Sequence, residues 1–173
     1  MTDTDIPQRL SAVRDRAARA ALAAGRNPAD VRLIAVSKNF PVDSVRAAAS
    51  AGQVDFGENR VQEGLEKIAA GPAGLEWHLI GHLQTNKARK AAAAFRWIHS
   101  IDSVDLLLKV DRAAADAGKT PSVLIQVDLA GEATKSGAKP EAVPAIVDAA
   151  RGCASARLVG LMLMPPFFDD PED

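Results

Sequence analysis

The 173-residue sequence has few residues that could form cross-links, because Cys153 is its only cysteine. An intrachain disulfide and a multi-cysteine metal site are therefore excluded. The longest apolar run, residues 158–168, is interrupted by Pro165 and Pro166 and is shorter than the ~20 residues of a membrane helix. The first ten residues lack the basic and apolar segments of a secretion signal. We therefore expect a cytoplasmic protein with no membrane partner.

The sequence also lacks an excess of either charge, since 21 basic and 22 acidic residues give a formal net charge of −1. This balance gives no reason to expect a nucleic-acid partner. Several arginines lie between residues 9 and 26, and we interpret them as a solvated helix face. The hydrophobic share of 47% is typical of a globular domain with a substantial core.

Short apolar runs alternate with alanine-rich helical patterns along the chain. A first helix is expected at residues 6–24, where Gly25 ends it. The pattern then predicts strands at residues 31–36, 54–56, 77–80, 97–101, 122–129 and 158–164, separated by helices at 42–51, 60–70, 86–94, 103–117 and 140–150. This alternation predicts βαβ units and a parallel sheet in a single domain of residues 1–173.

Two α/β architectures fit this pattern, an open doubly wound sheet and a closed (β/α)8 TIM barrel. No G-x-G-x-x-G or G-x-x-x-x-G-K-[ST] motif follows any predicted strand, so the main sign of a nucleotide-binding open sheet is missing. A (β/α)8 barrel takes about 200 residues or more. We therefore expect about six of the eight βα units in this chain, with the last two missing and the first and sixth strands unpaired at their outer edges.

Polar residues gather where the predicted strands end, which is where barrels carry their functional groups. Lys38 directly follows a buried apolar strand, so we expect its amine to be shielded from water. Shielding favours the neutral amine, which is the nucleophile that adds to a carbonyl group or to pyridoxal phosphate (PLP). The alternative from spacing alone is a strand-end lysine whose charged end reaches solvent.

The other strand-end residues leave alternatives open. Glu58 and Asn59 are either site residues or ordinary turn residues. His78, His82 and His99 lie on separate segments without compact ligand spacing, so we expect satisfied or exposed histidines and no metal site. The loop at residues 134–137 is either a flap over the site or a plain surface loop.

Six stretches of the sequence resemble the PLP homeostasis protein family. They follow one another in the family's order and cover nearly the whole chain after the first helix. The stretches are LIAVSK at 33–38, FGENRVQEG at 56–64, WHLIGHLQTNK at 77–87, IHSID at 98–102, VLIQVDLAGEATKSG at 123–137 and VGLMLMPP at 159–166. The resemblance implies an alanine-racemase-like (β/α)8 barrel.

The resemblance also implies roles for four residues. Lys38 is the expected Schiff-base lysine, and Asn59 and His78 are expected around the cofactor ring. Lys135 is expected to be a second lysine near the site and a candidate for PLP transfer. The implied protein is a non-catalytic PLP carrier in intracellular PLP homeostasis, with PLP-dependent apoenzymes as partners and a monomer expected for the full-length protein.

The sequence departs from the family at its C-terminal end. Family members continue with two further segments, which supply the groups that hold the PLP phosphate and an arginine facing the pyridine nitrogen. Neither segment is present by residue 173, so this chain is expected to carry the covalent anchor without the phosphate site.

Two other functions remain as alternatives. One is a PLP-dependent amino-acid racemase-like enzyme on the related fold. Alanine racemases place a tyrosine opposite the lysine, and this sequence contains no tyrosine. The other is an interaction protein that retains the barrel and would keep its effect without Lys38.

Overall fold

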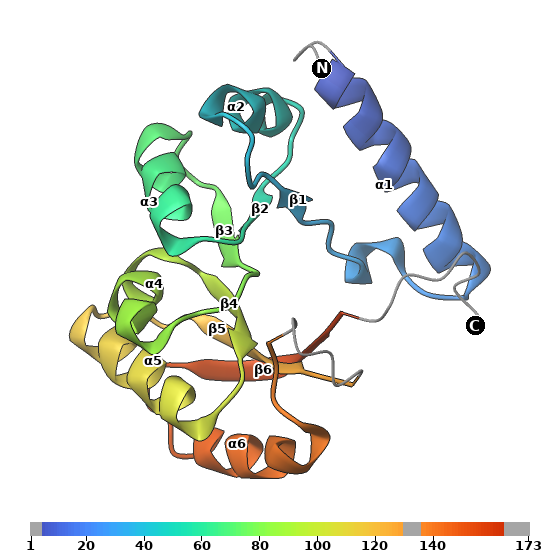
Figure 1. Cartoon of the computed structure of the whole chain (residues 1–173). Helices are drawn as coiled ribbons and strands as arrows, with labels where there is room; N and C mark the ends of the chain where they lie inside the picture. The colour runs from blue at the N-terminus through green and yellow to red at the C-terminus, as the bar shows by residue number, and fades with distance from the viewer. Residues whose placement is uncertain (1–4, 130–135, 165–173) are drawn as a thin grey trace.

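The computed structural model describes residues 5–129 and 136–164. Its six strands form one sheet in which neighbouring strands are parallel and follow chain order. They are β1 (Ala35–Val36), β2 (Asp55–Glu58), β3 (Glu76–Leu79), β4 (Trp97–Ile101), β5 (Ser122–Val127) and β6 (Arg157–Leu163). A doubly wound sheet reverses its strand order at a switch point. The sequential order therefore confirms the barrel-type architecture (Figure 1).

The helices lie outside the curved sheet. Helices α2 to α6 follow one another along one side of it, and α1 lies apart from the sheet, beside α2 (Figure 1). They are α1 (Ile6–Ala23), α2 (Val42–Ser50), α3 (Val61–Ala70), α4 (Ala88–Ala94), α5 (Val104–Asp116) and α6 (Val143–Ala150). The helices predicted from residues 86 and 140 begin with short 3-10 turns, η3 (Thr85–Lys87) and η4 (Pro140–Ala142).

The first strand is much shorter than predicted. The apolar run at 31–36 pairs with β2 only at Ala35 and Val36. The side-chain amide of Gln53 donates to the carbonyls of Leu33 and Asp55, at 2.8 and 2.7 Å. Since this side chain satisfies the Leu33 carbonyl, the chain before Ala35 needs no ladder hydrogen bond there.

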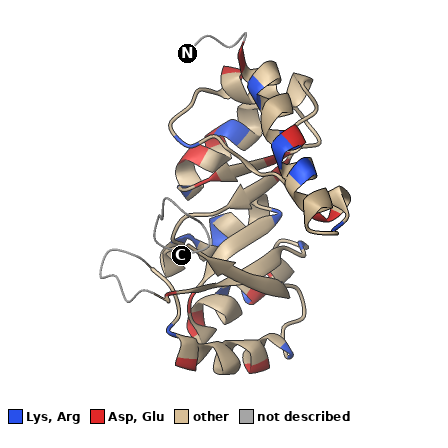
Figure 2. Ribbon diagram, turned by 90° about the vertical axis from the view of Figure 1, so that its right-hand side faces the viewer, with Lys and Arg blue, Asp and Glu red and all other residues tan. Residues whose placement is uncertain are grey.

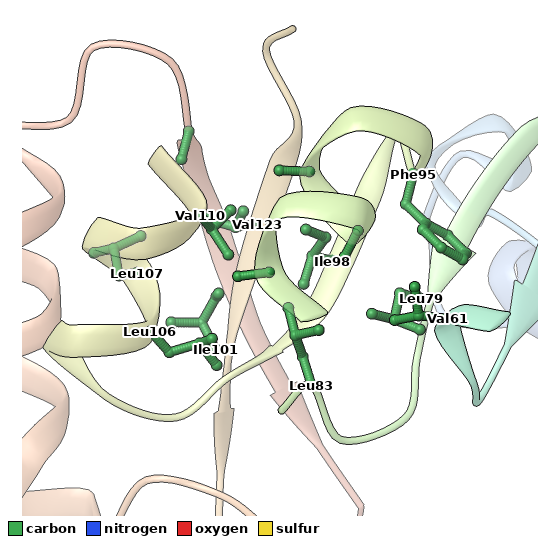
Figure 3. Close-up of a cluster of buried hydrophobic side chains, with 14 of the residues drawn as sticks. Val61, Leu79, Leu83, Phe95, Ile98, Ile101, Leu106, Leu107, Val110 and Val123 are labelled. Atoms are coloured by element: carbon green, nitrogen blue, oxygen red, sulfur yellow. The ribbon is translucent and has the colours of Figure 1, made fainter. Parts of the chain in front are cut away.

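The face of the sheet that packs on α2 to α6 carries the hydrophobic core (Figure 3). Side chains of a strand alternate between two faces, and those on this face are almost fully buried. The strand members of the core include Phe56, Leu79, Ile98, Val123 and Ile125, and the helix members include Leu106, Leu107 and Val110. The alternate residues of the strands place their side chains on the opposite face, toward the barrel interior.

Helix α1 is attached to the body of the protein by one of its arginines. Arg14 donates to the carbonyls of Ala51 and Gly52, at 3.0 and 2.8 Å. The interpretation of the N-terminal arginines as a solvated face is therefore wrong for Arg14, because the loop after α2 offers it unpaired carbonyls.

Charged residues of both signs are interspersed over the ribbon (Figure 2). No helix among residues 5–129 and 136–164 is long and apolar enough to cross a membrane.

Helices α3 and α4 meet at a glycine, and this contact gives a first prediction. A Cβ atom at Gly64 would overlap the ring of Phe95, which is 2% exposed. Gly64→Ala gains roughly 1 kcal/mol of helix propensity, whereas overpacking a core typically costs about 1–3 kcal/mol. We expect a net loss of up to about 2 kcal/mol in the free energy of unfolding, measured by urea denaturation. Gly152 has ordinary space for a Cβ, so Gly152→Ala is the control, and equal stabilities of the two variants would contradict the prediction.

Candidate functional site

Lys38 lies in a tight turn directly after β1. The carbonyl of Ser37 accepts the N–H of Phe40 at 3.0 Å, and Asn39 has a φ of 64°. Asparagine tolerates this left-handed conformation at the third turn position better than most residues. The Lys38 side chain is exposed. The prediction that the Lys38 amine is shielded from water is therefore wrong, because Lys38 lies in the turn, outside the buried part of the sheet.

A buried polar cluster lies behind this turn, between β1, β2 and α3. The Ser37 hydroxyl donates to Glu58 Oε1 at 2.6 Å. The Lys67 ammonium donates to the Ser37 carbonyl, Glu58 Oε1 and Glu63 Oε1, at 2.6, 2.7 and 2.8 Å. Glu63 Oε1 also accepts the N–H of Asn39 at 2.7 Å. We call Ser37, Glu58, Glu63 and Lys67 the Lys67 cluster.

The electrostatics of the Lys67 cluster keep Lys67 charged. Burial by itself would lower the pKa of Lys67, but its hydrogen bonds to Glu58 and Glu63 outweigh burial and raise that pKa. The hydrogen bonds from Lys67 and from the N–H of Asn39 lower the pKa of Glu63. Lys67 is therefore held as an ammonium, which is not a nucleophile.

Glu58 is the last residue of β2 and is 0% exposed. Its interpretation as a turn residue is therefore wrong, because its carboxylate faces α3 and pairs with Lys67. Its second oxygen, Oε2, has no hydrogen-bond partner among the described residues.

Asn59 is placed by the close approach of two loops. A Cβ atom at Gly81 would overlap the backbone of Asn59, and the N–H of Ile80 donates to the Glu58 carbonyl at 2.9 Å. Glycine at position 81 therefore permits the contact that fixes the backbone of Asn59. Asn59 itself is half-buried.

The strand register relates Lys38 to the other predicted site residues. Direct partners across the first four strands form one row of residues, Val36, Gly57, His78 and Trp97. Two residues further along the chain from these four come Lys38, Asn59, Ile80 and His99; Lys38 and Asn59 lie just beyond the ends of β1 and β2. Because side chains alternate along a strand, the paired row and His99 of β4 belong to the face opposite the core. Lys38, Asn59 and His99 therefore each come two residues after a member of the paired row, and His78 is a member of that row.

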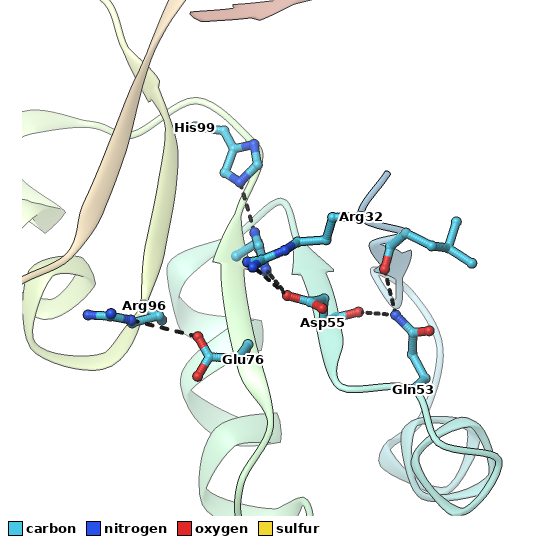
Figure 4. Close-up of polar contacts among 8 residues, drawn as sticks. Arg32, Gln53, Asp55, Glu76, Arg96 and His99 are labelled. Carbon is cyan, nitrogen blue, oxygen red and sulfur yellow. Dashed lines mark hydrogen bonds and ion pairs between the residues drawn. The ribbon is translucent and has the colours of Figure 1, made fainter. Parts of the chain in front are cut away.

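A chain of polar contacts runs from His99 of β4 to Asp55 of β2 and Arg32 (Figure 4). His99 Nε2 lies 2.9 Å from His78 Nδ1, and His78 Nε2 lies 2.9 Å from Asp55 Oδ1. Arg32 lies 3.4 Å from the same oxygen of Asp55. Because the carboxylate of Asp55 accepts a hydrogen bond from His78, the ring hydrogen of His78 is on Nε2. The other ring nitrogen of His78, Nδ1, then accepts a hydrogen bond from His99 Nε2. The remaining ring nitrogen of His99, Nδ1, is then an acceptor.

Burial keeps both histidines of this chain neutral. It lowers the pKa of His78, although the hydrogen bond with Asp55 opposes the shift. Burial and the neighbouring His78 lower the pKa of His99 to about 4. The His78 ring also stacks on Trp97, with centroids 5.3 Å apart, and Arg32 covers Trp97 at 4.8 Å. These contacts fix the orientation of the His78 ring.

The structure brings some of the predicted residues together and leaves others apart. His78 is 1% exposed, and its place beside a cofactor ring stays a prediction, as does that of Asn59. Lys135 lies outside the described residues; its described neighbour Ser136 accepts a hydrogen bond from Gln126 of β5. His82 lies apart from the other histidines, 3.7 Å from Asp102. Within residues 5–129 and 136–164, no group of three or more metal-ligating side chains could hold an ion.

Sequence reasoning did not single out Lys67, Glu63, Asp55 or Arg32. The signal for the first two was available, because Glu63 and Lys67 have the i, i+4 spacing of a helical ion pair and follow Glu58 closely. For Asp55 the signal was weaker, a charged residue within a strand. Its contact with His78 joins two strands and could not be derived from local spacing.

Comparisons with known proteins identify the family of this chain. The family described as alanine racemase, N-terminal domain, matches residues 9–173. A pyridoxal phosphate homeostasis protein of Pseudomonas aeruginosa is 44% identical over 162 residues, which are 92% of this chain and 70% of the relative. The chain belongs to the pyridoxal phosphate homeostasis protein family.

Solved structures extend the comparison. PipY of Synechococcus elongatus, solved with PLP bound, is similar with a TM-score of 0.75 and 41% identity, covering 88% of this chain and 71% of PipY. An alanine racemase of Clostridium difficile matches 78% of this chain and 36% of the racemase, with a TM-score of 0.65 and 20% identity. The racemase likeness shows the fold alone, and it places this member of the PLP homeostasis family on the alanine-racemase-like barrel.

Proposed function

We propose that this chain binds PLP covalently through Lys38 and serves intracellular PLP homeostasis, with little or no catalysis of its own. The observation that carries the proposal is the contrast between Lys38, in the turn after β1, and Lys67 of α3, whose ammonium contacts that turn. The amine of Lys38 is exposed, in a turn whose backbone is fixed, whereas Lys67 is held as an ammonium by two carboxylates. The proposal is further supported by the relatives named for PLP homeostasis and by PipY, solved with PLP bound.

The residues near Lys38 fit such a cofactor. When bound, PLP would supply an aldehyde carbon with which the Lys38 nitrogen would form a carbon–nitrogen double bond, with the loss of one water. Asn59 and His99, like Lys38, come two residues after a member of the paired row of Val36, Gly57, His78 and Trp97. The amide of Asn59 can donate to a ring oxygen, and His99 Nδ1 can accept from a donor on the ligand. His78 holds His99 in the tautomer that leaves this nitrogen available.

A carrier role is better supported than racemisation. Racemisation needs an acid or base on each face of the substrate carbon. The sequence contains no tyrosine to oppose Lys38, and the histidines of this face are neutral and already hydrogen-bonded to each other. PLP-dependent apoenzymes are the proposed recipients of the bound cofactor, and the proposed compartment is the cytoplasm.

The test is covalent capture of PLP by the purified chain. Wild type is incubated with PLP and reduced with borohydride, and the adduct is located by peptide mass spectrometry. We expect one adduct, on Lys38, and its complete loss in Lys38→Ala. Lys90 is exposed on α4, so Lys90→Ala is the control and should retain the adduct. An absent adduct in wild type, or equal adducts in wild type and Lys38→Ala, would refute the proposal.

The same preparations distinguish a carrier from a racemase. Wild type loaded with PLP is incubated with L-amino acids, and chiral chromatography measures the D-isomers. Background levels in wild type and Lys38→Ala are expected. Steady formation of D-isomers that Lys38→Ala abolishes would establish the racemase alternative instead.

A further inference from the structure

The backbone on both sides of Lys38 is anchored by side chains of α3. On the N-terminal side, the Ser37 carbonyl accepts from both the N–H of Phe40 and the ammonium of Lys67, at 3.0 and 2.6 Å. On the C-terminal side, the N–H of Asn39 donates to Glu63 at 2.7 Å. The turn therefore depends on side chains about 25 to 30 residues further along the chain, as well as on its own hydrogen bond.

Lys67 joins these anchors into one unit. Its ammonium has three hydrogens, and its three acceptors are the Ser37 carbonyl, Glu58 and Glu63. Because Glu63 accepts from Lys67 and from Asn39 through the same oxygen, Lys67 sets the position of the carboxylate that holds Asn39. The Lys67 side chain is 8% exposed and that of Glu58 is 0% exposed, so water does not compete for these contacts.

We infer that Lys67 is a positioning residue, which through Glu58 and Glu63 holds the turn at residues 37–40 so that the Lys38 amine is presented to an incoming aldehyde. This inference rests on the proposed function of Lys38. A turn fixed before the ligand arrives loses less conformational entropy when the covalent bond forms. The same contacts occupy every hydrogen of Lys67, so the aldehyde is directed to Lys38 although the Lys67 ammonium contacts the same turn.

The test uses two variants that are designed to fold. Glu58→Gln/Lys67→Met removes both buried charges together, a change that is often neutral for stability. Glu63→Ala removes the acceptor of the Asn39 N–H from a half-buried position. The control is Lys109→Met, which breaks an ion pair of the same i, i+4 spacing and of 2.7 Å length on α5, exposed and distant in sequence.

Two quantities are measured for each protein. Hydrogen exchange at the Asn39 and Phe40 amides is recorded without PLP. It is expected to be about tenfold faster in both test variants, because a tenfold change corresponds to the loss of one hydrogen bond to a charged group. The dissociation constant for PLP is expected to rise about tenfold as well. Lys109→Met is expected to match wild type in both measurements, and the β4–β5 amides are expected to exchange equally in all four proteins.

Each outcome decides the inference. Folded test variants with wild-type exchange at residues 39 and 40 and a wild-type dissociation constant would overturn it. Lower thermal stability with an unchanged dissociation constant would overturn it too, because a merely structural role gives that result. If wild type itself forms no adduct, the proposed function fails, and the exchange measurement without PLP still decides whether Lys67 holds the turn.

Discussion

Lys67→Met alone is expected to lower the free energy of unfolding by about 3–5 kcal/mol, because it leaves the carboxylate of Glu58 buried without its partner. Glu58 is 0% exposed, and its Oε2 already lacks a hydrogen bond among the described residues. Methionine retains the length and apolar stem of lysine, so the loss reports the charge rather than a cavity. Urea denaturation at neutral pH, followed by circular dichroism, measures the change.

The double replacement separates this cause from a loss of packing. Glu58→Gln/Lys67→Met should recover most of the lost stability, since both charges leave the core together. Lys109→Met breaks an exposed pair, and such pairs contribute about 0–1 kcal/mol. If Lys67→Met is no more destabilising than Lys109→Met, the pair of Glu58 and Lys67 does not hold the turn region in the way the structure indicates.

The second large effect is a loss of stability in acid that depends on His99. Burial lowers the pKa of His99 to about 4 in the folded chain, against about 6.5 in an unfolded one. Between these values the unfolded chain binds a proton that the folded chain does not, so acid favours unfolding. The contribution of His99 is complete above pH 6.5 and is lost progressively down to about pH 4. Its full size is on the order of 3 kcal/mol.

His99→Gln isolates this contribution. A glutamine amide can replace His99 Nε2 as the donor to His78 Nδ1, and it does not titrate. We therefore expect the stability of His99→Gln to fall less than that of wild type between pH 6.5 and 4, as measured by urea denaturation at a series of pH values. His78 adds to the residual slope, because burial lowers its pKa as well. His82 has a half-exposed side chain, so His82→Gln should follow wild type, and identical profiles for His99→Gln and wild type would contradict the prediction.

The sequence by itself determined the order of elements. Apolar runs and helical spacing are local properties, and the predicted strands and helices therefore agree with the structure to within a few residues for most elements. The exception is β1, where the apolar run at 31–36 predicts six strand residues and two pair. The difference arises because Gln53, some 20 residues away, satisfies the Leu33 carbonyl. The motifs around Lys38 likewise pointed to the family, since residue identity and order are contained in the sequence.

Only the tertiary structure decided the environment of each charged group. Lys38 and Lys67 are both lysines near the end of β1, yet one is exposed and the other is buried against two carboxylates. The contact between His78 and His99 likewise joins residues 21 positions apart on neighbouring strands. Burial and hydrogen bonding depend on neighbours that strand register and helix packing bring together across 20 to 30 residues, and local spacing contains no information about them.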